Sequence, residues 1–183
     1  MSRVPHKSIE ATSEIDPVVS AQLEAAGEDL SGHLFGAMGN VPGLGRAYFR
    51  FGAGIVSLCG IEPCLRELVA IVVLEALGAS NMAARHYQLA LKLGVTEHKL
   101  AQRHAFRTAP EFTETERSVL SFAAESAREV NVKAETFGKL ATWFTVQEQT
   151  ALTLLVAYYA GLACIAVPLE AQPDPIQEIE HDI

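Results

Sequence analysis

The chain has 183 residues, of which 49% are hydrophobic and 20% are charged. It is long and apolar enough for one globular domain with a sizeable core, which excludes disorder of the whole chain. The formal net charge is -8 and the basic residues are scattered singly, so nucleic acid is not an expected partner. The opening segment, residues 1–10, is polar and lacks the apolar core of a secretory signal. We therefore expect a cytoplasmic protein.

Three cysteines, Cys59, Cys64 and Cys164, match no zinc-binding pattern and cannot form a self-contained set of disulfides. We expect reduced thiols, no metal and no cofactor. Cys64 follows a proline in a predicted first helical turn, where the helix dipole can lower a thiol pKa, although neighbouring glutamates oppose that shift. Cys64 is therefore the candidate redox residue, with plain packing as the alternative. The other two cysteines are interpreted as small apolar fillers.

Proline and glycine divide the chain into predicted helices, and strand signals are nearly absent. Apolar residues recur at steps of three and four between these breaks, which is typical of helices that pack on one side. Helices are predicted after Asp16-Pro17, from Pro42 towards Cys59, from Pro63 to Gly78, from a cap at Ser80 or Asn81 to Gly94, and from Thr96 to about Arg107.

Two Thr-x-x-Glu patterns, at 113–116 and 145–148, indicate further helix starts. The threonine hydroxyl and the glutamate carboxylate satisfy each other's exposed backbone donors. Between them, an amphipathic helix is predicted from Phe137, Leu140, Trp143 and Phe144. We expect an all-α domain of about seven or eight helices over residues 31–170. Segment 1–30 contributes a short helix before it, and an acidic, proline-rich tail, 171–183, follows in an extended form.

Segment 151–169 carries no charged residue over 19 positions, which is long enough to cross a bilayer. It lacks a flanking cluster of lysines and arginines, and it is rich in alanine and glycine, which suit close helix packing. An apolar surface all around is expected of a helix that is enclosed by others. We expect a central buried helix, enclosed by other helices of its own or a neighbouring subunit, and no membrane partner.

Two carboxylates and one histidine stand out in the apolar region 63–94. Glu67 directly precedes the run LVAIVVL, Glu75 lies deeper in the same helix, and His86 falls on the next helix. A helical hairpin can bring the imidazole back towards either carboxylate. A carboxylate that holds one imidazole nitrogen leaves the other as a proton donor or acceptor near neutral pH. The alternative is structural, because a glutamate near a helix N-terminus is favoured by the dipole alone.

The run LRELVAIVVLEALGASNMAARHYQLALKLG, with NVPGLGRAYFRFG upstream and FTETERSVLSFAAE and LLVAYYAGLACIAVPLE downstream, resembles the carboxymuconolactone decarboxylase and AhpD-like alkylhydroperoxidase superfamily. The most telling part is Arg66-Glu67-Leu68-Val69, followed by His86 nineteen residues after the glutamate. The resemblance covers about residues 34–170. It implies an AhpD-like helical domain and a homo-oligomer, with Glu67 and His86 as proton-relay residues.

The resemblance also implies residues that this chain lacks. In the peroxidase branch a Cys-x-x-Cys pair ends four residues before the histidine, and Ala79 and Met82 stand at those positions. Neither can form a thiolate or a disulfide, so the standard peroxidase mechanism is excluded. In the decarboxylase branch a Glu-Trp pair precedes the histidine, and here Met82 and Ala83 replace it. The usual residue set for lactone decarboxylation is therefore incomplete.

What survives is a Glu67/His86 pair in an apolar pocket, for which Met82, Leu89, Tyr158 and Tyr159 are the predicted lining. The sequence predicts a carboxymuconolactone decarboxylase-like lyase or isomerase. In it, His86 is the general acid/base, Glu67 orients the ring, and the substrate is a small organic acid or lactone. Two alternatives stay open. One is a thiol peroxidase variant that uses Cys64 or Cys59, and the other is a non-catalytic ligand-binding or assembly subunit.

Overall fold

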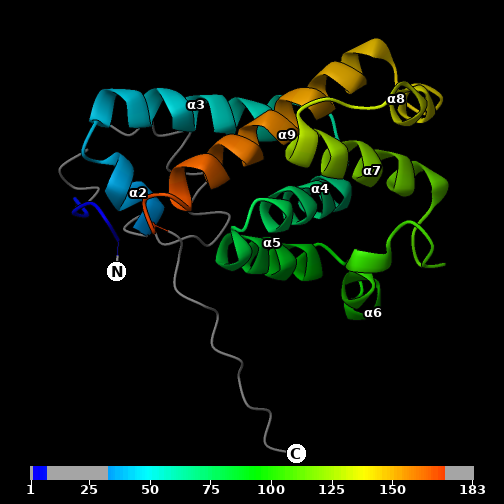
Figure 1. Ribbon diagram of the computed structural model, residues 1–183, viewed down its shortest axis with the longest axis horizontal. Helices are drawn as coiled ribbons and strands as arrows, with labels where there is room; N and C mark the ends of the chain where they lie inside the picture. The colour runs from blue at the N-terminus through cyan, green and yellow to red at the C-terminus, as the bar shows by residue number, and fades with distance from the viewer. Residues whose placement is uncertain (1, 8–32, 172–183) are drawn as a thin grey trace, which may run out of the picture.

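The computed structural model describes residues 2–7 and 33–171, and this part of the chain is helical, with no strand (Figure 1). The helix predicted after Asp16-Pro17 and the tail from 172 onwards lie outside the described residues. The expectation of an all-α fold is confirmed. The elements are α2 (His33–Met38), α3 (Pro42–Leu58), α4 (Pro63–Ala76), α5 (Ser80–Lys92), α6 (Glu97–Ala101), a 3-10 turn (Arg103–Ala105), α7 (Glu114–Glu129), α8 (Ala134–Ala141) and α9 (Val146–Ala166).

Most helix ends follow the sequence signals. Both Thr-x-x-Glu patterns form complete capping boxes, at the starts of α7 and α9. Gly78 and Gly94 end the turns after α4 and α5 with φ of 77° and 100°, a conformation that suits glycine. Glu62 adds a cap that the sequence analysis did not assign, because its carboxylate accepts hydrogen bonds from the backbone N–H groups of Cys64 and Leu65 at 3.0 and 2.9 Å.

Three local predictions were wrong. Ala79, rather than Ser80 or Asn81, is the N-cap of α5, because the Gly78 turn already holds Ala79 through its N–H bond to the Leu74 carbonyl at 2.8 Å. The helix expected from Thr96 to about Arg107 ends at Ala101, and a separate 3-10 turn, Arg103–Ala105, follows it. Helix α8 was predicted from Phe137, Leu140, Trp143 and Phe144, but it stops at Ala141, before the last two of them. Of these four residues only Leu140 is buried, and Phe137 and Trp143 are exposed.

Helix α4 lies at the centre of the fold, between α5, α7 and α9 (Figure 1). Its residues Val69, Ala70, Val73 and Leu74 are completely buried. A helix whose apolar residues face several neighbours at once needs little polar surface, which explains the run LVAIVVL. The position of α4 fixes Glu67, one turn into the helix, in the interior.

Within the described part of the chain, helix α9 is covered on one side only. Leu152, Leu155, Val156 and Tyr159 are buried, whereas Thr153, Leu154, Ala157 and Cys164 are exposed on the other side. The helix is long and apolar enough to cross a membrane, and 39% of its most apolar stretch is buried within the chain. The described residues of one chain do not enclose the helix, so the enclosure by its own or a neighbouring subunit stays a prediction. The absence of charge had predicted burial all around, but α3, α4, α7 and α8 do not surround α9.

Helices α3 and α9 cross where two tyrosines pack onto two glycines. Tyr48 of α3 donates a hydrogen bond from its hydroxyl to the Tyr158 carbonyl at 3.0 Å, and the two rings stack with centroids 5.5 Å apart. A Cβ at Gly161 would lie 2.4 Å from the Tyr48 hydroxyl oxygen, and one at Gly52 would lie 2.2 Å from that of Tyr158. Each tyrosine therefore reaches across to a glycine of the opposite helix.

Candidate active site

The α4–α5 hairpin brings Glu67 and His86 into direct contact. His86 Nδ1 lies 2.7 Å from Glu67 Oε2, and the two side chains are 12% and 6% exposed. The two residues face each other because the Gly78 turn reverses the chain between their helices. The predicted contact between this carboxylate and the imidazole is confirmed. Its catalytic role stays a prediction.

Arg66 holds the second oxygen of the same carboxylate. Its Nε lies 3.3 Å from Glu67 Oε1, and its terminal nitrogen donates to the Val56 carbonyl of α3 at 3.1 Å. Burial raises the pKa of Glu67, but the hydrogen bonds and charges of His86 and Arg66 outweigh it and leave the pKa below its ordinary value. Glu67 is therefore a carboxylate at neutral pH. Arg66 belongs to the Arg66-Glu67-Leu68-Val69 motif, but the sequence does not predict its contact with the carboxylate.

The ionised carboxylate determines which imidazole nitrogen carries the proton. A carboxylate can only accept, so His86 Nδ1 donates the hydrogen bond to Glu67. In the neutral ring Nε2 then has the free electron pair. Among the residues that the structure describes, none forms a hydrogen bond with Nε2. This nitrogen can accept a proton from a ligand.

Helix α9 supplies an aromatic wall beside the imidazole. The Tyr159 ring meets His86 edge to face, with centroids 5.0 Å apart and an interplanar angle of 83°. Tyr158 lies next to Tyr159 but reaches across to α3. On α5, Met82 is buried and Leu89 half-buried, one turn before and after His86. The structure thus brings Met82, Leu89 and Tyr159 to the imidazole, while Tyr158 packs against Tyr48 and Phe51 of α3. Their role as a substrate pocket stays a prediction.

The second carboxylate of the region, Glu75, is engaged elsewhere. It pairs with Arg103 at 2.8 Å and with His104 at 3.6 Å, at the far end of α4. The sequence left open which carboxylate meets His86, and the structure selects Glu67. In the described ranges, 2–7 and 33–171, no group of three or more histidine, cysteine or acidic residues could hold a metal ion.

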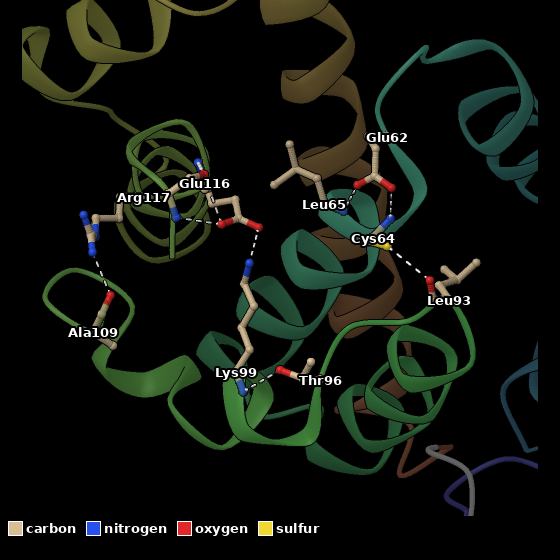
Figure 2. A network of polar contacts seen from close by, with 10 residues as sticks. Glu62, Cys64, Leu65, Leu93, Thr96, Lys99, Ala109, Glu116 and Arg117 are labelled. Carbon is tan, nitrogen blue, oxygen red and sulfur yellow. Dashed lines mark hydrogen bonds and ion pairs between the residues drawn. The ribbon is translucent and has the colours of Figure 1, made fainter. Parts of the chain in front are cut away.

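Cys64 is not set up as a reactive thiolate. Burial and the neighbouring Glu62 carboxylate raise its pKa, although Lys99 acts in the opposite direction. Figure 2 shows the thiol directed at the Leu93 carbonyl, 3.5 Å away, while Lys99 pairs with Glu116. The opposition that was expected from the neighbouring glutamates therefore outweighs the helix dipole at Glu62, and burial adds to it.

The other two cysteines differ from each other. Cys59 is half-buried and packs against the core, whereas Cys164 is exposed on α9. Cys164 is therefore no core filler, because it lies on the uncovered side of that helix. At the two positions where the peroxidase pattern has thiols, Ala79 and Met82 are both buried.

The helical architecture and the buried Glu–His pair together define an AhpD-like all-α protein. Residues 42–125, which include Glu67 and His86, match the model of the carboxymuconolactone decarboxylase family. This span is shorter than the domain predicted over 31–170, and the remaining helices α8 and α9 pack on the same core. No curated protein matches the chain.

Solved structures with similar folds cover nearly the whole chain. The debrominase Bmp8, in a cysteine-to-alanine variant bound to 2,3,4-tribromopyrrole, has a TM-score of 0.82 and 20% identity over 93% of this chain and 91% of its own. A peroxidase-related protein from Ralstonia eutropha JMP134 has a TM-score of 0.78 and 18% identity over 94% and 92%. An AhpD-type protein of unknown function from Agrobacterium tumefaciens has a TM-score of 0.69 and 20% identity over 73% and 92%. These likenesses show the fold.

Proposed function

We propose that this chain is a carboxymuconolactone decarboxylase-like enzyme that carries out acid/base chemistry on a small organic acid or lactone. The observation that carries the proposal is the 2.7 Å contact between two nearly buried groups, Glu67 and His86. An orienting carboxylate on Nδ1 with an open Nε2 is the arrangement that a general base needs. The match of residues 42–125 to the decarboxylase family model supports the same reading.

The proposed reaction uses His86 Nε2 to move one proton. In an isomerisation, Nε2 takes a proton from a carbon next to a carbonyl, and the electron pair stays on the substrate as an enolate. The imidazolium then returns the proton to a different carbon, which balances the reaction. In a decarboxylation, the ring first takes a proton from water, and the imidazolium then gives it to the carbon that keeps the electron pair of the broken C–CO2 bond. Glu67 keeps the ring oriented and stabilises its charged form.

The test measures exchange of carbon-bound hydrogen, which requires no knowledge of the final product. Carboxymuconolactone, related unsaturated acids and small aromatic acids are incubated with the enzyme in D2O, and proton NMR records loss of C–H signal. Small rings belong in this panel because the similar fold of Bmp8 binds 2,3,4-tribromopyrrole. His86→Gln should reduce the exchange rate about a hundredfold to ten-thousandfold. Glu67→Gln should reduce it less, because the amide oxygen can still accept one hydrogen bond.

The chain offers a matched control in the exposed His98, whose Nε2 lies 2.9 Å from Oε1 of the half-buried Glu111. His98→Gln removes the same kind of contact at the surface and should leave exchange unchanged. If His86→Gln exchanges every accepted compound as fast as the wild type, the acid/base proposal is wrong and a structural role for the pair takes its place.

The thiol alternative makes an opposite prediction. A peroxidase that used Cys64 or Cys59 would lose hydroperoxide turnover after alkylation, whereas a Glu–His enzyme would keep its exchange activity. The raised pKa of Cys64 argues against this alternative. A non-catalytic subunit would bind ligands with no exchange in any variant.

We also propose that the protein is a homo-oligomer. Helix α3 exposes Leu44, Phe51 and Leu58, which are spaced seven residues apart, with Ala47 and Gly54 between them. We call these five residues the α3 stripe. A seven-residue apolar repeat is the spacing with which one helix packs against another. Helix α9, which also exposes apolar residues such as Leu154, packs against α3 (Figure 1). Association of copies through this surface would cover it. A cytoplasmic location without a membrane partner stays a prediction.

A further inference from the structure

Helix α5 presents Arg85 on the same face as His86. Met82, Arg85, His86 and Leu89 follow the spacing i, i+3, i+4, i+7, which places all four side chains on one side of a helix. Met82 and Leu89 are therefore direct neighbours of both Arg85 and His86. Any ligand that reaches the imidazole between these two apolar residues also comes within reach of the guanidinium.

Arg85 lacks the polar partners that other half-buried cations have. Its Nε is shielded from solvent and meets no hydrogen-bond acceptor. No carboxylate in the described part of the chain forms an ion pair with it. Four other half-buried cations are paired with a carboxylate, namely Arg66 with Glu67, Lys99 with Glu116, Arg103 with Glu75 and Arg117 with Glu114. The Nε of Arg117 likewise meets no acceptor, so Arg85 differs from these four cations in having no carboxylate partner among the described residues.

A guanidinium cannot release its proton to escape burial, so an unpaired Arg85 keeps its charge and its unsatisfied donor. Such a group costs free energy unless an acceptor reaches it. A ligand carboxylate meets this need, because two oxygens can accept from two guanidinium N–H groups at once. A phosphate group offers the same oxygens with a larger negative charge. The ionised Glu67 on the adjacent helix opposes that larger charge.

We propose that Arg85 binds the carboxylate of the substrate on which His86 acts. This inference rests on the proposed acid/base function and specifies the substrate class as a small monocarboxylate. The guanidinium holds the acid group at one point on the α5 face, and the carbon skeleton then lies along Met82 and Leu89 towards the imidazole. Arg85 is thus the residue that selects acids over neutral compounds of the same shape.

The experiment compares three probes in the full-length protein, which are benzoate, its neutral analogue benzamide, and inorganic phosphate. Calorimetry gives the Kd of each, and the Nε–H resonance of Arg85 in a proton–nitrogen NMR spectrum reports whether that atom gains an acceptor. Benzoate should bind more tightly than benzamide and shift this resonance. Arg85→Gln should weaken benzoate binding about tenfold to a hundredfold and leave benzamide binding unchanged. Arg85→Lys should restore part of the loss, because it keeps the charge without the planar fork.

Lys92 provides the matched control, because it carries the same charge on an exposed part of the same helix. Lys92→Gln should leave benzoate binding unchanged. The inference is overturned if benzoate and benzamide bind alike, if Arg85→Gln and Lys92→Gln weaken benzoate equally, or if phosphate displaces benzoate at equal concentration. Melting curves identify any variant that fails to fold. If Arg85→Gln does not fold, the benzoate affinity of Arg85→Lys is compared with that of the wild type instead.

Failure of this inference can be told apart from failure of the proposed function. If hydrogen exchange depends on His86 but is equally fast for acids and amides in Arg85→Gln and the wild type, the acid/base function holds and Arg85 has no part in it. If Arg85 selects benzoate but no compound exchanges, the anion site exists without the proposed chemistry.

Discussion

The α4–α5 hairpin and the α3–α9 crossing both place polar groups inside apolar surroundings, but they do so by different means. In the hairpin, Glu67 and His86 meet as a charged, hydrogen-bonded pair at 2.7 Å. In the crossing, Tyr48 meets a backbone carbonyl and a glycine through a neutral hydroxyl. The hairpin closes its polar pair within the chain, whereas the crossing lies beside exposed apolar residues.

This difference suits the hairpin to proton transfer and the crossing to the support of a contact surface. The hairpin has an ionisable group whose state changes with pH, held on α4, the most buried helix of the fold. The crossing has no such group near neutral pH, because burial, with a smaller effect from Cys164, raises the pKa of Tyr48 to about 12. The first region can therefore perform proton transfer, and the second can serve as a fixed support that carries the α3 stripe. The following experiments separate these two roles.

The largest effect is expected when charge is added to the α3 stripe. Leu44→Glu and Leu58→Glu place a carboxylate in the surface through which we propose that copies associate, so light scattering should show conversion to monomers. Val130→Glu is the control, because Val130 is also strongly exposed but lies between α7 and α8. If all three variants keep the wild-type mass, or if the wild type is itself a monomer, the assembly proposal is wrong.

The next largest effect is expected on stability, when Gly52 and Gly54 of α3 are each replaced by alanine. Gly52→Ala puts a methyl group against the Tyr158 ring and should lower the free energy of unfolding by about 1–3 kcal/mol. Gly54 has no atom within 4 Å of an added Cβ, so Gly54→Ala should raise it by up to about 1 kcal/mol through helix propensity. Thermal and urea unfolding measure both. Equal effects of the two substitutions would contradict close packing at the crossing.

The two regions also differ in how far the sequence predicted them. The hairpin follows from local signals, since Pro63 and Gly78 bound α4, and the spacing of Glu67 and His86 puts them face to face across a turn. The crossing depends on residues about 110 positions apart, and no local pattern indicates that Tyr48 reaches Tyr158. The uncovered side of α9 was missed for a related reason. Uncharged sequence predicts that a surface will be covered, but it does not distinguish coverage by the same chain from coverage by another.

Arg66 and Arg85 show a second limit of the sequence. Both adjoin a site residue, and nothing in the sequence indicates that one pairs with Glu67 and reaches the Val56 carbonyl while the other has no partner among the described residues. Where a long cationic side chain ends depends on tertiary packing. The candidate pair could therefore be predicted from spacing, whereas the groups that set its charge and select its ligand could not.

A smaller effect is expected in acid. The pKa of Glu67 is lowered in the folded state, so this carboxylate stabilises the protein above its unfolded pKa, near 4.5, and the contribution is lost as pH falls through the lower folded value. Glu67→Gln should be less stable than wild type at pH 7 by about 1.5 kcal/mol, and the difference should shrink below pH 4.5. Urea unfolding from pH 7 to pH 3 measures this. A difference that stays constant over the range would mean that the pKa of Glu67 is the same in the folded and the unfolded state, and would contradict the lowered folded value.

The smallest effect concerns the hydroxyl of Tyr48, and a double substitution isolates it. Tyr48→Phe removes one hydrogen bond to the Tyr158 carbonyl and should cost about 1 kcal/mol. The cost should be the same from pH 5 to pH 9, because a phenol with a pKa of about 12 stays neutral there. Gly161→Ala alone should also destabilise the protein, because its Cβ would meet the hydroxyl oxygen at 2.4 Å.

When both substitutions are combined, the clash disappears with the hydroxyl, and the nearest ring carbon lies 3.4 Å from the new Cβ, which is ordinary contact. The double variant should then be more stable than the sum of the single effects predicts, since alanine also favours the helix. Strict additivity of the two free energies would show that the tyrosine and the glycine do not touch, and would remove the crossing as the fixed support of the α3 stripe.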